Sequence, residues 1–397
     1  MQSGYKHRGI ISDNAVLEDR TLHLDSSPFI PDECYHPPEQ LGNIELWYAD
    51  VYDPVTGSVF VVQFTCGPDA LKKETVLFIS FHSYTPDHGV TSTTRQVPAG
   101  QLHVIEDPYQ VTLEHSVIRA QKHPDSHRSA YHIHVKLEDV LVDIIIEPVV
   151  TSWIPFGEKI AFHDTRRKGI FSWIPAIPKG KVSGSVTIGQ STTKLTDAHG
   201  YYDHTYWETG TQPPFHPNPL FWDDVVVRWM WLKIIQDDIK IAVNEFRFRP
   251  WLDDRSISSF LVCKGDSIVL SSNHEVRLER KQTTPDIPYR KAGQFNLSCS
   301  LNDMNLMFGV TPTNLLRYQD MLEYTHPVSR PLVKMVFGSP VAFYSMARVD
   351  VNMTFGTEKI VLSDAVAFYE PMVLNTRPSR FEDRVRRMIS KRISRRV

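Results

Sequence analysis

The chain has 397 residues, 41 % hydrophobic and 22 % charged, and a formal net charge of −3. This length predicts two or three domains, and the composition is typical of a globular protein rather than a disordered one. Lys and Arg number 43 against 46 Asp and Glu, so the charge favours no nucleic-acid partner. Aromatic residues reach 11 %, which suits β-sheets or an aromatic pocket.

Four cysteines occur, and none of them forms a Cys-x-x-Cys pair: Cys34, Cys66, Cys263 and Cys299. Their spacing predicts reduced, packed thiols rather than a disulfide framework. The polar stretch from Met1 to Asp13 lacks the apolar run of a signal peptide, and no apolar stretch reaches the roughly 18 residues that span a bilayer. We therefore expect a cytoplasmic protein without stable membrane insertion.

Residues 1–40 are rich in Pro, Asp and Ser and predict an irregular lead-in. Three apolar runs then indicate strands buried on both faces: Val59–Phe64, Val76–Phe81 and Val140–Ile146. Tyr131–Glu138 alternates between apolar and polar residues, which predicts a strand with one wet face.

Proline clusters mark the middle of the chain. Pro175 and Pro178 predict a connection, because proline cannot donate to a strand ladder. A second cluster, Pro213–Pro219, is the candidate domain boundary. It divides an N-terminal β-domain at 41–215 from a C-terminal β-domain at 216–379.

Strand signals resume after that boundary. Val225–Ile235 and Ile239–Phe248 predict a hairpin that turns near Asp237 and Asp238. Lys264-Gly265-Asp266 is a turn signal between two further short strands. The series continues through four more apolar segments: Val276–Leu278, Phe295–Leu301, Val341–Val351 and Ala365–Phe368. Short strands with regular turns indicate a sandwich or an up-and-down barrel, so the expected class is all-β with few helices.

Two segments predict helices. Thr313–Tyr324 is the first. The tail at 380–397 is the second, with apolar residues at helical spacing among many arginines. A solvated or self-docked terminal helix is one interpretation of the tail, and peripheral contact with a membrane surface is the other.

The densest polar and aromatic segment is His199–Glu208. On a strand, Tyr201, Asp203, Thr205 and Trp207 would share one face. A desolvated carboxyl at Asp203 would be a proton donor, and an ionised one would orient a neighbour such as His204. The alternative is a structural hydrogen-bond cluster at a domain junction.

Other motifs are weaker. Trp222, Trp229 and Trp231 predict either the wall of a pocket for a flat or polyene ligand or ordinary sheet packing. His132 and His134 would share one strand face, but a zinc site needs further ligands, so an exposed face is the favoured interpretation and no metal site is predicted. The sequence contains no phosphate loop, Gly-x-Ser-x-Gly elbow or Rossmann glycine fingerprint.

Three segments together resemble a known superfamily. Glu45-Leu46-Trp47-Tyr48 is similar to its Glu-Trp-Trp-Tyr opening strand, with Leu46 in place of one Trp. Trp173–Pro178, followed by Lys181–Gly184, resembles its Trp/Pro link into a Val-x-Gly strand. Gly200–His204 resembles its Gly-Tyr-His-Asp-His motif. The set resembles the lipocalin-like carotenoid 1,2-hydratase (hydroxyneurosporene synthase) superfamily, which includes the fungal Diels-Alderases of polyketide biosynthesis.

This resemblance implies an N-terminal sandwich-like, incomplete barrel, a C-terminal lipocalin-like barrel and a ligand pocket between them. In the hydratases the motif Asp is the proton donor to an alkene, and Asp203 matches it. Phe171 stands where those enzymes carry a helping His, and Thr205-Tyr206 replaces their Asn-Trp. These departures favour the branch whose pocket shapes a substrate without protonating it.

The leading hypothesis is therefore a cofactor-free pericyclase, an isomerase-class cyclase of secondary metabolism. It would catalyse an intramolecular Diels-Alder reaction of a polyketide or polyketide–amino acid hybrid, linear or a cytochalasan-type macrocycle. We assign catalysis to Asp203, Tyr201 and His204, and contact with the hydrophobic substrate to seven aromatic residues: Trp47, Tyr48, Trp173, Trp207, Trp222, Trp229 and Trp231. The alternatives are an alkene hydratase or proton-initiated terpenoid or carotenoid cyclase with Asp203 as acid, and a non-catalytic carrier of an apolar metabolite.

Overall fold

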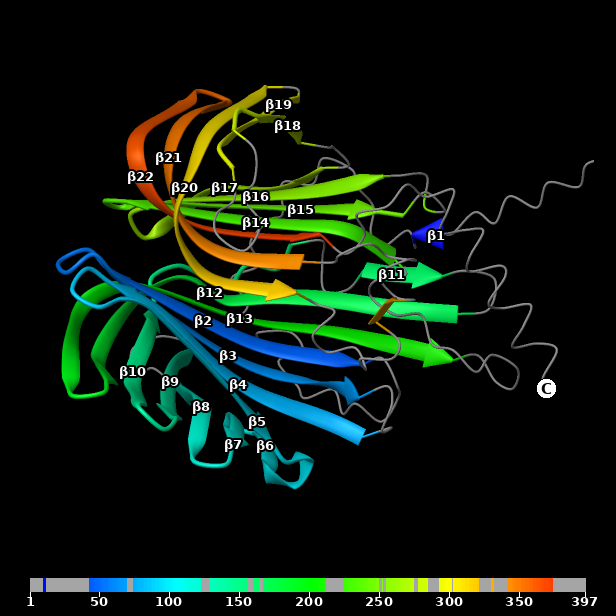
Figure 1. The fold of residues 1–397 in the computed structure, drawn as a ribbon. Helices are drawn as coiled ribbons and strands as arrows, with labels where there is room; N and C mark the ends of the chain where they lie inside the picture. Colours follow the sequence, from blue (N-terminus) through cyan, green and yellow to red (C-terminus); the bar gives the residue numbers. More distant parts are fainter. Residues whose placement is uncertain are drawn as a thin grey trace, which may run out of the picture.

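Two large antiparallel sheets make up the protein in a computed structural model (Figure 1). Helix is confined to short stretches in the described part of the chain, such as the 3₁₀ turn η2 (Ala99–Gln101). The all-β class predicted from the sequence is confirmed. The structure describes residues 10–11, 43–69, 74–122, 129–155, 160–163, 167–211, 225–249, 252, 255–274, 278–284, 293–301, 303–320, 330–331 and 341–373.

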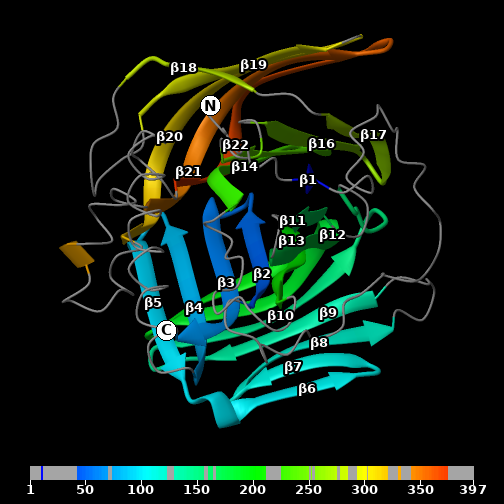
Figure 2. The same ribbon diagram turned by 90° about the vertical axis from the view of Figure 1, so that its right-hand side faces the viewer.

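The first sheet has 13 strands and follows the order β5-β4-β3-β2-β13-β12-β10-β9-β8-β7-β6, with β1 and β11 joined at β12. It bends round on itself, so that β6 to β9 lie across from β3 and β4 (Figure 2). The strands are β1 (Ile10–Ile11), β2 (Ile44–Asp53), β3 (Ser58–Asp69), β4 (Glu74–Thr85), β5 (Gly89–Val97), β6 (Leu102–Glu106), β7 (Tyr109–Leu113), β8 (Ser116–Lys122), β9 (Ser129–Lys136), β10 (Val140–Pro148), β11 (Ile160–His163), β12 (Arg167–Ile188) and β13 (Ser191–Thr211).

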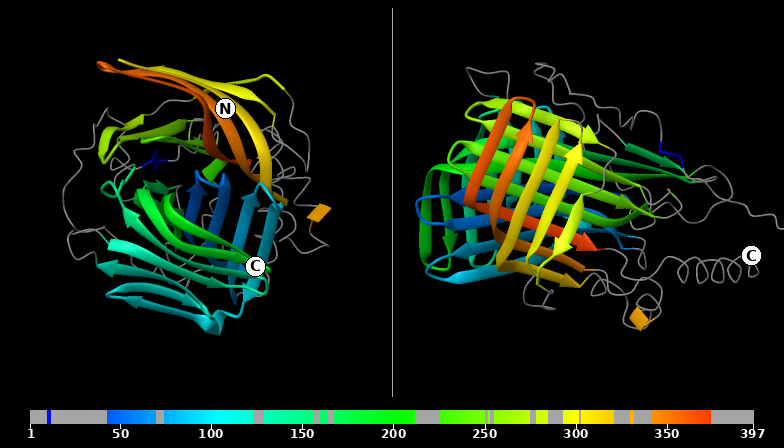
Figure 3. Two further views of the ribbon diagram at one scale, coloured as in Figure 1. Left: turned by 90° about the vertical axis from the view of Figure 1, so that its left-hand side faces the viewer. Right: turned by 90° about the horizontal axis from the view of Figure 1, so that it is seen from above.

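The second sheet has nine strands in the order β17-β16-β15-β14-β22-β21-β20-β19-β18 and curls into a half-barrel (Figure 3). Its strands are β14 (Val226–Gln236), β15 (Ile239–Phe248), β16 (Ser256–Lys264), β17 (Ser267–His274), β18 (Glu279–Gln282), β19 (Phe295–Leu301), β20 (Met304–Asp320), β21 (Val341–Phe355) and β22 (Glu358–Val373). The predicted hairpin of β14 and β15 and the turn at Gly265 are both present, and Asp237 and Gly265 adopt the positive φ that such tight turns require.

Three apolar cores follow from this arrangement. One fills the bend of the first sheet, around residues such as Phe64, Phe81 and Ile133. Another fills the half-barrel of the second sheet, around Leu232 and Phe308. The third lies between the two sheets and takes side chains from both; we call it the inter-sheet core. Period-two alternation lets each central strand serve two of these cores at once.

Three local predictions are wrong. Thr313–Tyr324 is not a helix over its described part, because residues 313–320 belong to β20, which pairs with β21 and places Leu316 in the inter-sheet core. Tertiary pairing overrides helix propensity here. Pro175 and Pro178 lie inside β12 rather than in a connection, at two register shifts against β13 where no ladder hydrogen bond is needed. Val140–Ile146 is buried on one face only, since Leu141 is 41 % exposed.

The predicted lead-in at 1–40, apart from Ile10–Ile11, and the predicted tail helix at 380–397 lie outside the described residues. The predicted boundary between 215 and 216 also lies outside them and stays a prediction. No helix in the described part of the chain has the length and hydropathy that crossing a membrane requires. The cytoplasmic location stays a prediction.

Candidate functional site

Strand β13 carries the polar and aromatic segment picked out from the sequence, and it lies between β2 and β12 in the middle of the first sheet. Its side chains alternate between two cores. Tyr201 and Trp207 belong to the inter-sheet core, whereas Tyr202 belongs to the core of the first sheet. Asp203 and Thr205 therefore face the second sheet, as the period of two predicted.

Asp203 is the buried carboxyl at the centre of this face. Its Oδ2 accepts hydrogen bonds from the Trp173 Nε1–H at 3.0 Å and from the Tyr201 hydroxyl at 2.7 Å. The Thr205 hydroxyl lies 3.5 Å from Oδ1. Burial raises the pKa of Asp203 to about 7, against these hydrogen bonds, which lower it. Such a carboxyl is partly protonated at neutral pH and can donate a hydrogen bond or a proton.

A second buried carboxyl, Glu370 on β22, meets this cluster from the second sheet. Burial raises the pKa of Glu370 to about 8; the negative charge of Asp203 adds to the rise, and a hydrogen bond from Tyr344 opposes it. Glu370 was not predicted from the sequence. The available signal was weak: Glu370 is the one charged residue in the apolar run from Ala365 to Val373.

Aromatic rings surround the two carboxyls. Tyr48 on β2 meets Trp231 on β14 edge to face, with ring centroids 5.4 Å apart, and Tyr201 lies 5.1 Å from Trp231. Burial raises the pKa of Tyr48 and of Tyr201 well above the ordinary value, and neighbouring carboxylates add to the rise. Both phenols therefore stay protonated and remain hydrogen-bond donors. Of the seven aromatic residues predicted to contact substrate, Tyr48, Trp173 and Trp231 lie in this cluster, and their role stays a prediction.

A transverse row of polar side chains crosses the second sheet at the level of Glu370. Strand register places its members directly opposite one another on five neighbouring strands, so all point toward the first sheet: Glu370, Trp231, Asn244, Ser259 and Asn273. All are buried. Within the described residues, five polar atoms on four side chains of this row have no hydrogen-bond partner: Trp231 Nε1, Asn244 Nδ2 and Oδ1, Ser259 Oγ and Asn273 Oδ1.

This polar row is energetically unusual. A buried polar atom without a partner costs about 1–3 kcal/mol, and native proteins keep few of them. Several together on one face weaken the closed contact between the sheets and favour the entry of groups that can pair with them. None of these residues except Trp231 was predicted from the sequence, because the row exists only once five strands are aligned.

His204 does not join Asp203, so the predicted orientation of His204 by that carboxylate is wrong. Its Nε2 lies 2.8 Å from Glu45 Oε1, and its ring stacks on Trp47 with centroids 5.3 Å apart. Trp47 in turn donates its Nε1–H to the Tyr109 hydroxyl at 2.6 Å. Adjacent residues on a strand point to opposite faces, so His204 points away from the inter-sheet core. Together with its cross-strand partner Trp47, it faces the core enclosed by the first sheet.

Two of the remaining predicted residues, Trp207 and Trp229, belong to or pack against the inter-sheet core. Trp207 contacts Phe162 at a centroid distance of 5.8 Å, and half-buried Trp229 contacts Phe246 at 5.6 Å. Trp229 Nε1 also has no hydrogen-bond partner among the described residues. Trp222 lies outside the described residues.

Buried lysines join the two sheets beside this cluster. Lys233 of β14 forms an ion pair with Asp50 of β2, and Lys240 of β15 donates to the Gly200 carbonyl at 3.0 Å. Burial lowers the pKa of Lys240 to about 7. At another edge, Arg317 of β20 donates to His82 Nε2 at 3.3 Å. These contacts fix the two sheets at the border of the carboxyl cluster.

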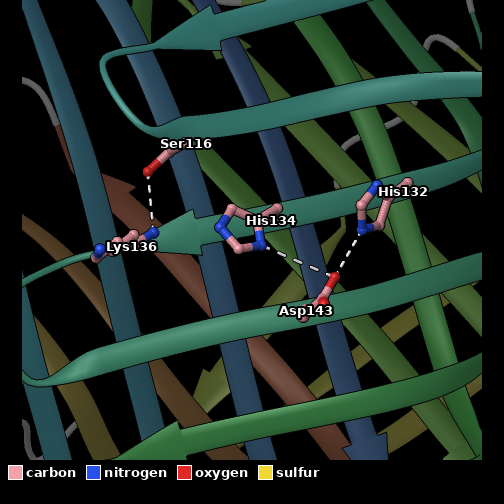
Figure 4. A network of polar contacts seen from close by, with 5 residues as sticks. All are labelled: Ser116, His132, His134, Lys136 and Asp143. Carbon is pink, nitrogen blue, oxygen red and sulfur yellow. Dashed lines mark hydrogen bonds and ion pairs between the residues drawn. The ribbon is translucent and has the colours of Figure 1, made fainter.

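His132 and His134 lie on one face of β9 beside Asp143, as Figure 4 shows. Asp143 Oδ1 is 2.6 Å from His132 Nε2 and 3.8 Å from His134 Nδ1. The described residues contain no group of three or more His, Cys, Asp or Glu side chains arranged to hold a metal ion. A shared carboxylate is what the structure provides for the two imidazoles.

Comparison with known proteins bears on the fold. No family model and no curated protein matches the chain by sequence. The crystal structure of CghA with Sch210972 is similar at a TM-score of 0.51 and 11 % identity, over 84 % of this chain and 89 % of CghA. CghA alone matches at 0.51 and 10 % identity over 93 % and 99 %, and the NE1406 protein of Nitrosomonas europaea at 0.50 and 13 % over 88 % and 100 %. These similarities show that the chain shares the overall fold of CghA and of the NE1406 protein.

Proposed function

We propose that this protein is an enzyme that folds a polyketide or polyketide–amino acid hybrid between its two sheets and catalyses an intramolecular [4+2] cycloaddition without a cofactor. The observation that carries the proposal is the pairing of a buried, partly protonated carboxyl, Asp203, with a row of unpartnered hydrogen-bonding groups on the facing sheet. Aromatic rings from both sheets supply the apolar surface between them.

The reaction converts three π bonds into two new carbon–carbon σ bonds and one shifted π bond, and no proton enters or leaves. Its barrier is largely the cost of bringing diene and dienophile together, and preorganisation supplies up to roughly 7–11 kcal/mol in favourable cases. A hydrogen bond to the dienophile carbonyl adds on the order of 2–4 kcal/mol by analogy with oxyanion donors. Protonated Asp203, Tyr201 and Trp231 are the donors within this cluster.

The fold supports this proposal by analogy. The superfamily whose motifs the chain resembles includes the fungal Diels-Alderases, and CghA, which has a similar fold, was crystallised with Sch210972. Analogy of fold does not fix a reaction, so the reaction is assigned from the residues of the site. Phe171 matters here. It stands where the hydratases have their assisting His, and it packs against Phe246 with ring centroids 5.0 Å apart. An apolar neighbour in that position cannot pass a proton to Asp203.

The second candidate is an alkene hydratase or proton-initiated cyclase. The raised pKa of Asp203, about 7, favours it, because general acids work best when their pKa lies near the operating pH. A carrier of an apolar metabolite is the third candidate. A carrier would bind precursor and product alike and would leave the uncatalysed rate unchanged.

The test uses a linear polyene with a carbonyl-activated dienophile, turned over in D₂O and analysed by mass. We expect no non-exchangeable deuterium in the product. Deuterium on a former alkene carbon would establish acid chemistry at Asp203 instead, and a rate equal to that without protein would leave only the carrier.

Variants distinguish the cycloaddition from acid chemistry at Asp203 by an independent route. Asp203→Asn retains an N–H donor, so a cycloaddition should slow only about 10-fold, the scale of one modest hydrogen bond. Loss of an obligatory general acid should instead cost on the order of 10²–10⁴-fold, the usual range for such groups. Thr205→Val is the matched control, because its contact with Asp203 is long at 3.5 Å.

A further inference from the structure

Four members of the polar row on the second sheet are neutral and lie side by side. Strand register aligns Trp231 on β14, Asn244 on β15, Ser259 on β16 and Asn273 on β17. Their exposed fractions are 3 %, 0 %, 0 % and 7 %. A charged group taken out of water needs a charged or fully hydrogen-bonded partner, so a buried surface made of neutral groups favours a neutral ligand. We call these four residues the neutral row.

The unpaired atoms of the neutral row define what such a ligand must offer. Among the residues that the structure describes, neither Nδ2 nor Oδ1 of Asn244 has a hydrogen-bond partner, so the conclusion holds whichever way this amide is turned. Trp231 Nε1 adds a donor, Asn273 Oδ1 an acceptor, and Ser259 Oγ a group that can be either. A ketone oxygen only accepts, so it would leave both asparagine oxygens unpaired. A hydroxyl both donates and accepts, and therefore satisfies every kind of atom in the row.

The neutral row is too long for a single hydroxyl. It crosses the four strands from β14 to β17, and neighbouring strands lie about 4.7–4.9 Å apart. Hydrogen bonds between a hydroxyl and another oxygen span about 2.7–2.8 Å, so one hydroxyl can bridge groups on two adjacent strands at most. Trp231 and Asn244 therefore offer a place for one hydroxyl, and Ser259 and Asn273 offer a place for a second.

Apolar side chains border the neutral row on both sides. Ala242 and Phe246 lie two residues before and two residues after Asn244, on the same face of β15, and both belong to the inter-sheet core. Ile257 and Leu261 take the same positions on β16 and belong to the same core. A sugar is polar on all its edges and would lose hydrogen bonds against these borders. A mainly apolar chain that carries separate hydroxyls matches both the row and its surroundings.

From these observations we propose that the neutral row binds at least two hydroxyl groups of the substrate, which is therefore a hydroxylated polyketide chain. This inference rests on the proposed function, because it concerns the substrate of the same site between the sheets. The row adjoins the carboxyl cluster: the Trp231 ring lies 5.1 Å from the ring of Tyr201, whose hydroxyl donates to Asp203. Hydroxyls held in the row thus determine which part of the chain reaches Asp203.

Equilibrium dialysis of the full-length protein with dodecane-4,8-diol tests the proposal. Dodecane-4,8-dione has the same skeleton and spacing but only accepts hydrogen bonds, and decanamide is a neutral amide. We expect the diol to bind at least about 10-fold more tightly than the dione, the scale of one or two hydrogen bonds. Equal affinities for diol and dione would overturn the proposal. Decanamide binding more tightly than the diol would also overturn it and would assign the row to an amide.

Replacement of Asn244 locates the site. Asn244→Leu removes both amide atoms with little change in size, so it should weaken diol binding at least about 10-fold. The same change should raise the midpoint temperature of unfolding of the free protein, because two buried, unpaired polar atoms are lost. An asparagine with a purely structural role would lower that temperature when replaced.

Two further variants complete this test. Ser259→Ala is a smaller change that serves if Asn244→Leu does not fold, and it should weaken diol binding about 3- to 10-fold. Asn352→Leu alters an exposed asparagine on β21 and should leave the diol affinity unchanged. Wild-type diol affinity in both Asn244→Leu and Ser259→Ala would contradict the proposal.

The probes are saturated, so their binding requires no cycloaddition. Preference for the diol in a protein without turnover would leave hydroxyl recognition in place and refute the proposed reaction alone. Turnover of the polyene together with equal binding of diol and dione would refute hydroxyl recognition alone.

Discussion

The two faces of β13 at Asp203 and His204 invite comparison, because the residues are neighbours in the chain and both are buried. On one face, Asp203 receives hydrogen bonds from Trp173 and Tyr201 and meets Glu370 of the other sheet. On the other face, His204 lies against Glu45 and stacks on Trp47 within a single sheet.

The difference lies in what each ionisable group has as a partner. His204 and Glu45 are of opposite type and complete each other, which is the arrangement of a structural contact. Asp203 and Glu370 are of the same type. Burial disfavours ionisation of both, and the charge of Asp203 further disfavours ionisation of Glu370, which leaves protons on buried carboxyls. Only the second arrangement leaves a buried carboxyl able to donate a proton or a hydrogen bond, and it occurs where the two sheets meet.

The largest effect is expected on the structural face. His204→Leu removes the partner of Glu45 Oε1 and should lower the free energy of unfolding by roughly 3–5 kcal/mol, the usual cost of breaking a buried pair. Denaturant titration measures this. His103→Leu, on exposed β6, is the control and should change stability by less than about 0.5 kcal/mol.

A double variant checks the cause. Glu45→Leu combined with His204→Leu should cost less than the sum of the single changes, because no carboxyl is left buried without its partner. Additive losses would show that the pair is not coupled and would remove the contrast between the two faces.

An intermediate effect is expected on the carboxyl face, through pH. Burial raises the pKa of Glu370 from 4.5 to about 8, so between these values the folded state keeps a proton that the unfolded chain has lost. Stability from this group is present in full below pH 4.5 and is lost as pH rises toward 8. Asp203 acts in the same direction between 3.8 and about 7.

Glu370→Gln should remove that dependence. The difference in unfolding free energy between the variant and wild type should move in favour of the variant by roughly 3 kcal/mol between pH 5 and pH 8, at about 1.4 kcal/mol per pH unit. Denaturant titrations across this range measure it. Glu358→Gln changes an exposed carboxyl on the same strand and is the control. Parallel curves for wild type and Glu370→Gln would mean that Glu370 titrates normally.

The smallest effect is expected within the hydrogen bonds to Asp203. The 3.0 Å hydrogen bond from Trp173 to Oδ2 lowers the pKa of Asp203. Trp173→Phe removes this donor, so the pKa of Asp203 should rise by about one unit, the scale of a hydrogen bond to a charged group. Infrared difference spectra of the carboxyl stretch follow the titration. Trp47→Phe, on the opposite face, should leave the pKa of Asp203 in place; an equal shift in both variants would show that the faces communicate.

The sequence predicted the parts of this protein that depend on local pattern. Alternation placed Tyr201, Asp203, Thr205 and Trp207 on one face, and turn residues located the hairpin of β14 and β15. These predictions succeed because the side-chain direction in a strand is fixed by position alone. The same rule, applied between Asp203 and His204, already separates them, although proximity in the chain suggested a pair.

Tertiary structure decided what those faces meet. Glu370 lies 167 positions after Asp203 in the sequence. Only the packing of β22 across from β13 brings the two carboxyls into one cluster. The row through Asn244, Ser259 and Asn273 likewise arises from the register of separate strands, and pairing with β21 makes a strand of residues predicted to be helical. Local pattern fixes which way a side chain points, whereas long-range pairing, driven by burial of the inter-sheet core, fixes its neighbours.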